Sequence, residues 1–203
     1  MIRRSNMPTI KFDVTDSFTH IPRQDMTNID KQRNGYQSAS PFPHVVLDNF
    51  LANEIAAKLS SEFGGSNTSS FYQRSQEKNK YSFNPDDNMT PFCRSVFHAF
   101  NSRNFIEWLE GLTGVEGLIP DPYYAGGGFH ETRAGGYLNI HADFNIHKRL
   151  NLLRRINVLV YLNEDWKADY GGNLELWNSD MESAVKVIEP TFNRCVIFNT
   201  TES

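Results

Sequence analysis

Cysteine is scarce in this sequence, with only Cys93 and Cys195 among 203 residues. Each lies among apolar neighbours, so we expect two buried free thiols rather than a disulfide or a metal-binding pair. The disulfide framework that holds small secreted domains together is therefore excluded. Free thiols fit a reducing compartment, and we expect a cytoplasmic protein.

Long apolar runs are also missing, because no stretch approaches the roughly 18 residues of a membrane span. The basic N-terminus MIRRSNMPTIKFD is followed by no apolar stretch, which is not the pattern of a secretory signal. A net charge of −4 and a pI near 5.9 give no general affinity for nucleic acid. We expect neither a membrane nor a nucleic acid as partner. With 39% hydrophobic residues, one globular domain with a sizeable core is predicted.

Residues 1–40 are polar and have little apolar periodicity, which predicts an extension that is partly disordered or draped over the core. Structure is expected to begin at Pro41, with a short strand at 44–48. A helix with Asn53 as N-cap and Gly64-Gly65 at its end is predicted from apolar residues every four positions, at Leu51, Ile55, Leu59 and Phe63.

Residues 64–90 are rich in Ser, Asn and Lys and are predicted to form a loop. Thr90-Pro91 has the pattern of an N-cap followed by proline at the first helical position. Ser102 is expected to start a further helix, which closes near Gly111 or Gly114.

From about residue 117 the apolar period changes to two, which indicates strands. The candidate strands are 128–132, 136–144, 156–162, 174–177, 184–188 and 194–199. Helices followed by short antiparallel strands predict an α+β fold, a double-sheet jelly roll with the helices packed outside one sheet.

The run GGGFHETRAGGYLNIHADFN contains His141 and Asp143, two residues apart on a predicted strand. Alternation places both on one face, together with Tyr137 and Asn139. A His and a carboxylate are two corners of a 2-His-1-carboxylate site for non-haem Fe(II), which leaves positions open for substrate and O2. The alternative is an exposed strand face that carries a surface His-Asp pair.

Four motifs between Pro41 and Ser203 resemble, in order, those of 2-oxoglutarate- and Fe(II)-dependent oxygenases of the prolyl-4-hydroxylase-like group. They are PFPHVVLDNFLANEIA, GGYLNIHADFN, RRINVLVYLNEDW with GGNLELW, and VIEPTFNRCVIFNTTES. The resemblance implies a double-stranded β-helix, or jelly roll, oxygenase domain over residues 41–203. It implies Fe(II) and 2-oxoglutarate as cofactors, O2 as cosubstrate, and hydroxylation of an aliphatic carbon in a peptide, protein or small molecule, with a prolyl residue as the first candidate. Ascorbate use is common among such relatives.

The same resemblance implies that His141 and Asp143 ligate the iron. Tyr161 matches a position where relatives bind the distal carboxylate of 2-oxoglutarate, although a core tyrosine with a satisfied hydroxyl would show the same pattern. Tyr137, Asn139 and Asn157 are further candidates for contact with the cosubstrate. Presence of Asp143 favours hydroxylation over halogenation.

Lys148, Arg149, Arg154 and Arg155 cluster after the iron motif, either as a solvated loop or as a mouth that attracts an acidic substrate. Arg154 and Arg155 are the candidates for substrate contact, because both enter the next strand. His130 is a third candidate for substrate contact. His147, four residues past Asp143, is not expected to be an iron ligand.

The family's distal His and its Arg or Lys for 2-oxoglutarate would follow 194–199 closely, and neither is present. We therefore expect a C-terminally truncated domain, without its final strands and with little or no activity. Two functions remain open: a hydroxylase, and a non-catalytic binding module on the same fold. An oxygenase acting on nucleobases is disfavoured by the acidic pI and by the lack of an aromatic-basic stripe.

Overall fold

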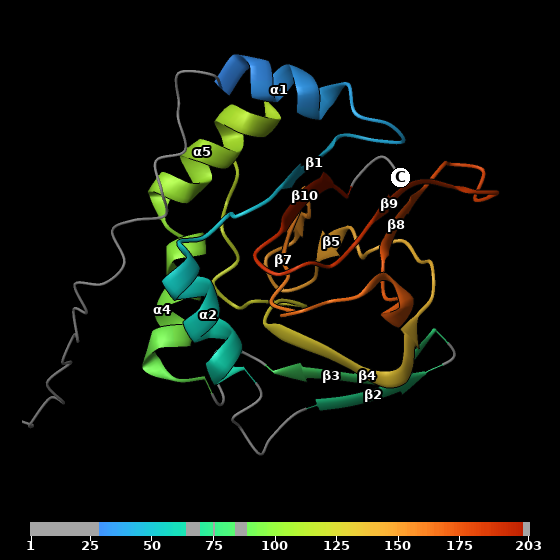
Figure 1. Cartoon of the computed structure of the whole chain (residues 1–203). Helices are drawn as coiled ribbons and strands as arrows, with labels where there is room; N and C mark the ends of the chain where they lie inside the picture. Colours follow the sequence, from blue (N-terminus) through green and yellow to red (C-terminus); the bar gives the residue numbers. More distant parts are fainter. Residues whose placement is uncertain (1–28, 64–69, 75, 84–88, 201–203) are drawn as a thin grey trace, which may run out of the picture.

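The computed structural model describes residues 29–63, 70–74, 76–83 and 89–200 (Figure 1). Its helices are α1 (Ile29–Gln37), α2 (Asn53–Glu62), α4 (Pro91–Phe100) and α5 (Arg103–Thr113), with a 3-10 turn at Ala168–Tyr170. Its strands are β1 (His44–Leu47), β2 (Ser70–Arg74), β3 (Glu77–Phe83), β4 (Phe129–Leu138), β5 (Ile146–His147), β6 (Leu152–Leu153), β7 (Ile156–Val160), β8 (Leu174–Trp177), β9 (Ala184–Ile188) and β10 (Cys195–Asn199).

Among the described residues, all the strand pairs are antiparallel and form two three-stranded sheets and two ribbons. The sheets have the orders β1-β10-β7 and β2-β3-β4, and the ribbons are β5-β6 and β8-β9. Figure 1 shows the helices gathered on one side of the molecule and the strands on the other. The predicted α+β order is therefore confirmed.

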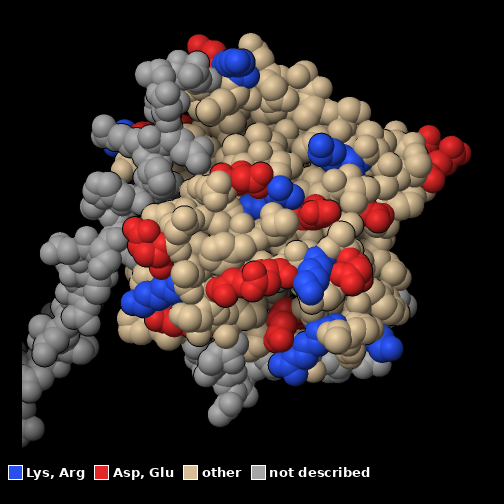
Figure 2. Space-filling model, in the orientation of Figure 1, with Lys and Arg blue, Asp and Glu red and all other residues tan. Residues whose placement is uncertain are grey.

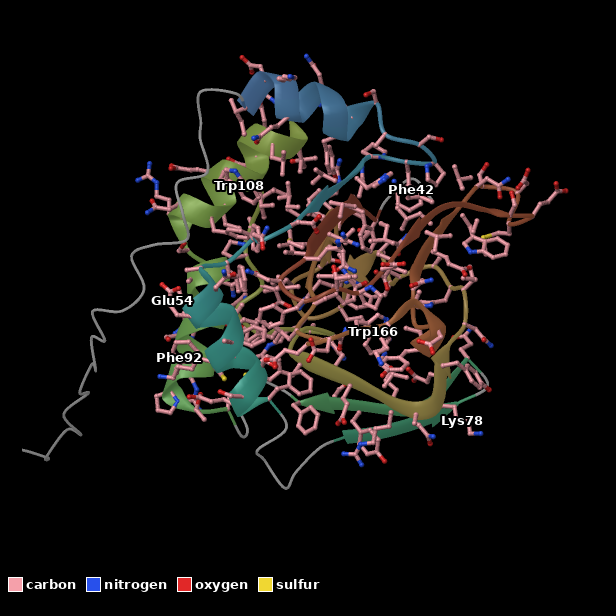
Figure 3. All side chains as sticks on the ribbon, viewed as in Figure 1. Phe42, Glu54, Lys78, Phe92, Trp108 and Trp166 are labelled. Atoms are coloured by element: carbon pink, nitrogen blue, oxygen red, sulfur yellow. The ribbon has the colours of Figure 1, made fainter. Side chains whose placement is uncertain are left out.

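The central strand β10 is buried on both faces, which explains its continuous apolar sequence CVIFN. Cys195 and Ile197 face the larger core, which the helices share, and Val196 belongs to a second cluster with Leu176 and Ile188 of the β8-β9 ribbon. Trp108 on α5 lies in the larger core, whereas Trp166 lies on the strand side of the molecule (Figure 3). Because successive side chains of β10 point to opposite faces, the strand packs against the helical layer on one face and against the β8-β9 ribbon on the other.

Helix α1 lies inside the segment predicted to be an extension, so the expectation that structure begins at Pro41 is wrong. Its sequence is polar, but tertiary contacts hold it: Tyr36 is 1% exposed. The guanidinium of Arg33 donates to the carbonyl of Gly111 at 2.7 Å, and the amide of Gln37 donates to that of Thr113 at 3.2 Å. These bonds satisfy carbonyls at the C-terminal end of α5 that have no partner within the helix. Residues 1–28 lie outside the described residues.

The loop predicted for 64–90 is also corrected, because β2 and β3 lie within it. Strand β3 is polar, yet it pairs on both sides, with β2 and with β4. Only its end residues Glu77 and Phe83 are buried, so no clear period of two marks it in the sequence. Backbone pairing, rather than apolar patterning, makes it a strand.

Two predicted strands, 128–132 and 136–144, form the single strand β4, which ends at Leu138. The turn predicted at 134–136 is a bulge: Tyr137 pairs with Lys78 and Thr132 pairs with Lys80, so four residues lie opposite Asn79 alone. A Cβ at Gly136 would lie 2.7 Å from the carbonyl oxygen of Lys78, which explains glycine at this close approach.

Helix ends agree with most of the predicted caps. Thr90 accepts a hydrogen bond from Cys93 N at 3.2 Å at the start of α4, and Ser102 accepts one from Phe105 N at 3.3 Å at the start of α5. Gly114 ends α5 with a φ of 74°. The N-cap of α2 is Ala52 rather than Asn53, and the Asn53 side chain instead accepts from Asn193 at 3.3 Å. Gly64-Gly65 lies outside the described residues.

Candidate iron centre

His141 and Asp143 lie just past the end of β4, in a segment without strand pairing, so the prediction that they sit on a strand is wrong. The last backbone bond of the preceding ladder runs from Asn139 N to Gln76 O at 2.8 Å. Strand β3 begins at Glu77 and β4 ends at Leu138, so the ladder between them does not extend to His141 and Asp143. The spacing of two still brings the side chains together, with His141 Nε2 3.5 Å from Asp143 Oδ1.

In each of these two side chains, the polar atom that faces away from the other side chain is bonded to a neighbouring residue. His141 Nδ1 lies 2.7 Å from the carbonyl oxygen of Asn139. A carbonyl can only accept, so Nδ1 carries the proton and the lone pair of the neutral ring is on Nε2. Asp143 Oδ2 accepts a hydrogen bond from Asn157 Nδ2 at 3.0 Å and lies 3.5 Å from the guanidinium of Arg154.

The atoms left available are therefore an imidazole nitrogen and a carboxylate oxygen, 3.5 Å apart, on side chains that are 32% and 26% exposed. Nitrogen and carboxylate oxygen donors suit Fe(II), and metal-bound His residues usually donate their other ring N–H to an acceptor, as His141 does. The donor set fits a non-haem iron site. Within the described part of the chain, no third His, Cys, Asp or Glu completes a group that could hold a metal.

His147 and His130 are engaged away from His141. His147 Nδ1 accepts from Leu150 N at 3.0 Å, and its Nε2 lies 3.3 Å from Asp121 Oδ1. His130 Nδ1 lies 2.9 Å from Ser82 Oγ, and its Nε2 lies 3.2 Å from the carbonyl oxygen of Gly126. Part of His130 is exposed, but burial of the ring, followed by the charge of Lys80, lowers its pKa.

The two tyrosines predicted to contact 2-oxoglutarate differ in environment. Tyr161 follows β7 and packs against the second apolar cluster. Burial, assisted by Cys195, raises the pKa of Tyr161 to about 12, so its hydroxyl is protonated at neutral pH and can donate to a carboxylate. Tyr137 is 45% exposed, near the end of β4. Asn139 contributes its backbone to the site, through the bond to His141.

Arg154 and Arg155, the candidates for substrate contact, do not share an environment. Arg154 reaches Asp143, and its guanidinium lies 4.5 Å from the centre of the Phe144 ring. Arg155 has a buried Nε without a partner among the described residues. Its charge acts on Tyr36 of α1, where it opposes the effect of burial on that pKa. Only Arg154 is beside the His141–Asp143 pair.

The loop before β4 supplies residues that the sequence analysis missed. Asp121 accepts backbone bonds from Tyr123 at 2.8 Å and Ala125 at 2.5 Å, which shapes the loop. Gly126 then lies against the ring of Phe144, where a Cβ would be 3.0 Å from Cε1. The only signal for this arrangement was Asp121 between two prolines followed by three glycines. Figure 2 shows positive and negative side chains interspersed on the visible face, with no large area of one sign.

Comparison with known proteins matches part of this sequence to a family model and the fold to solved structures. Residues 127–203, which contain His141 and Asp143, match the model of the 2OG-Fe(II) oxygenase superfamily. A prolyl-4-hydroxylase from Pseudomonas putida is similar in structure, with a TM-score of 0.61 and 16% identity over 85% of this chain and 87% of that one. No curated protein matches the sequence significantly.

A second similar structure is a prolyl hydroxylase from Trichoplax adhaerens, in complex with a peptide fragment of the hypoxia inducible factor oxygen degradation domain. Its TM-score is 0.55, with 18% identity over 86% of this chain and 78% of that one. The chain therefore has the jelly-roll fold of the prolyl hydroxylases, as predicted. Residues 127–203 match the model of the 2OG-Fe(II) oxygenase superfamily, and the resemblance to prolyl-4-hydroxylases is confirmed at the level of the fold.

Proposed function

We propose that the protein to which this chain belongs is an Fe(II)- and 2-oxoglutarate-dependent dioxygenase that hydroxylates an aliphatic carbon, with a prolyl residue in a peptide or protein as the substrate class. The observation that carries the proposal is the pair His141 Nε2 and Asp143 Oδ1, 3.5 Å apart with their outer atoms already bonded. The prolyl substrate rests on the likeness to two prolyl hydroxylases, one of them solved with a peptide.

His141 and Asp143 would hold the iron, and Tyr161 would donate its protonated hydroxyl to the distal carboxylate of 2-oxoglutarate. Tyr137, exposed at the end of β4, is a candidate for contact with cosubstrate or substrate. Bound Fe(II) supplies the O2 chemistry in which 2-oxoglutarate is oxidised to succinate and CO2 while one oxygen atom enters the substrate C–H bond. The protein positions the reactants and excludes water.

Arg155 and His130 do not touch the His141–Asp143 pair. Both remain candidates for contact with the substrate. For Asn157 and Arg154, the contacts with Asp143 favour another role, argued below. Ascorbate use and a cytoplasmic location are proposed from the family resemblance and from the free thiols. Among the described helices, none has both the length and the apolar character needed to cross a membrane.

A binding module on the same fold is the second candidate function. It is favoured by one observation, that the described residues bring only two metal ligands together. For the same reason we expect the 203-residue polypeptide, purified alone, to release little or no succinate. An iron-dependent rate typical of such oxygenases from this polypeptide would show that expectation to be wrong.

Metal binding followed by turnover separates the two functions. The protein made from its native gene is supplied with Fe(II), 2-oxoglutarate, O2 and a proline-rich peptide, and the peptide is analysed by mass spectrometry. A hydroxylase adds the mass of one oxygen atom to a prolyl residue, and a His141→Ala variant does not. Peptide binding without any product, in the presence of tightly bound metal, supports the binding module.

A further inference from the structure

The two carboxylate oxygens of Asp143 have different surroundings. Oδ1 faces His141 Nε2, whereas Oδ2 lies within 3.0 Å of the Asn157 amide nitrogen and 3.5 Å of the Arg154 guanidinium. A carboxylate with one oxygen bonded in this way offers the other to a metal. One-oxygen coordination leaves one more position open for cosubstrate and O2 than two-oxygen coordination does.

Asn157 is well placed for this task because it belongs to the interior of a ladder. It lies on β7 and pairs with Phe198 of β10, whose neighbouring residues are buried. The backbone of Asn157 is therefore fixed by the sheet, and its amide nitrogen donates to an oxygen fourteen residues earlier in the chain. An aspartate at this position could not donate in its ionised form.

Arg154 is held from several sides. Its backbone N donates to Asn145 O at 2.9 Å, and its carbonyl accepts from Thr200 Oγ1 at 2.9 Å. The guanidinium lies over the ring of Phe144, which itself contacts Gly126. With its side chain 20% exposed, Arg154 has little freedom to turn toward a substrate.

We infer that Asn157 and Arg154 are positioning residues, which hold Oδ2 of Asp143 so that Oδ1 alone is presented to the metal. This inference rests on the proposed function, because it requires a metal ion at His141 and Asp143. It gives Arg154 a role within the metal centre instead of contact with an acidic substrate. It also explains why an arginine beside the iron motif is partly buried.

The test is the affinity of the 203-residue protein for Mn(II), measured by electron paramagnetic resonance of the free ion. Asn157→Leu and Asn157→Asp should each weaken binding roughly tenfold, which is the usual effect of losing an outer hydrogen bond to a metal ligand. Arg154→Met should weaken it similarly, and Arg154→Lys should retain most of the affinity. The absorption spectrum of bound Co(II) should change in Asn157→Leu, because the carboxylate is freed to bind through both oxygens.

Asn163→Leu is the matched control, because the Asn163 amide also donates one part-buried hydrogen bond, to Pro190 O at 2.8 Å, with no contact to Asp143. It should bind Mn(II) like the unmodified protein. Thermal melting of the metal-free variants shows whether each one folds. If Asn157→Leu does not fold, the test rests on Asn157→Asp, which keeps the side-chain shape.

Two different negative results would separate the proposed metal site from the positioning role of Asn157 and Arg154. If Asp143→Ala binds Mn(II) as well as the unmodified protein, there is no metal site here and the proposed function fails. If binding depends on Asp143, but folded Asn157→Asp and Arg154→Met keep full affinity and the same Co(II) spectrum, the positioning role is overturned and the proposed function stands.

Discussion

Single side chains connect distant parts of this chain, and Asn193 does so in the core. Asn193 is 1% exposed and has a φ of 58°. Its amide donates to Leu51 O at 2.8 Å and accepts from Leu51 N at 2.9 Å, while its backbone carbonyl accepts from Phe50 N at 3.0 Å. The turn that precedes β10 is thereby fastened to the start of α2.

Asn193→Ala should lower the free energy of unfolding by about 2–4 kcal/mol, because buried partners lose their hydrogen bonds and alanine is strained at positive φ. Urea unfolding measures the change. Asn193→Gly removes the same hydrogen bonds but tolerates the backbone angle, so it should be less destabilised than Asn193→Ala. A change under about 0.5 kcal/mol for alanine, the range of ordinary surface substitutions, would contradict this role.

His130 should make the stability of the metal-free protein depend on pH. Burial is the largest cause of its lowered pKa, and the charges of Lys80 and Arg154 act in the same direction. The Gly126 carbonyl and Glu77 act in the opposite direction and do not outweigh them. The unfolded chain therefore binds the proton more tightly than the folded one near the ordinary value of 6.5.

The stability that neutral His130 provides is present above pH 6.5 and is lost as the pH falls from there through the lowered folded pKa. Urea unfolding between roughly pH 5 and pH 8, on either side of the ordinary histidine value, should show this decline. In His130→Gln, whose amide can still donate to Gly126, the decline should be smaller. An identical pH profile for both proteins would show that His130 is not its source.

The closeness of the His141 and Asp143 side chains to each other could be predicted from their spacing, because side chains two residues apart on an extended backbone point to the same side. Their partners could not. Asn157 lies on β7 and Arg154 just before it, and both contact Asp143 only because the folded chain brings β7 beside the segment that follows β4. Nor does a sequence show that Arg154 and its neighbour Arg155 turn in different directions.

At the scale of elements, the helices whose ends have local signals were predictable, and those held by tertiary contacts were not. Thr90, Ser102 and Gly114 mark α4 and α5 because capping is a local interaction. Helix α1 has few apolar residues and depends on carbonyls at the end of α5. Strand β3 depends on backbone pairing with β2 and β4.

Thr90 joins two helices, since it caps α4 and its hydroxyl donates to Glu62 at the end of α2. Thr90→Ala should cost about 1 kcal/mol of unfolding free energy, with a range of 0.5–2, which is typical for the loss of a cap. Chemical denaturation provides the measurement. Thr90→Ser retains both interactions and should stay close to the unmodified protein; equal loss in both variants would argue against the cap.

At the scale of the whole molecule, the helical layer and the β8-β9 ribbon close over opposite faces of β10. This arrangement leaves Cys195 fully buried and Cys93 1% exposed on the helical side. Burial is the first cause of the raised pKa of both thiols. The prediction of buried free thiols is confirmed, since both cysteines are free and buried.

Both cysteines should therefore react with a disulfide reagent only when the protein unfolds. Labelling followed by mass spectrometry should show the two sites modified together, at a rate that rises with urea in parallel with unfolding. Rapid modification of one site in the native protein would indicate that the layer over it opens independently.

Succinate release shows whether His141 and Asp143 hold a catalytic iron. The protein made from its native gene is assayed with 2-oxoglutarate with and without Fe(II), beside His141→Ala and Asp143→Ala. We expect succinate release that requires iron and falls at least about 100-fold in either variant, since each removes a metal ligand. Iron-dependent release that survives both substitutions would show that the iron is bound elsewhere in the protein.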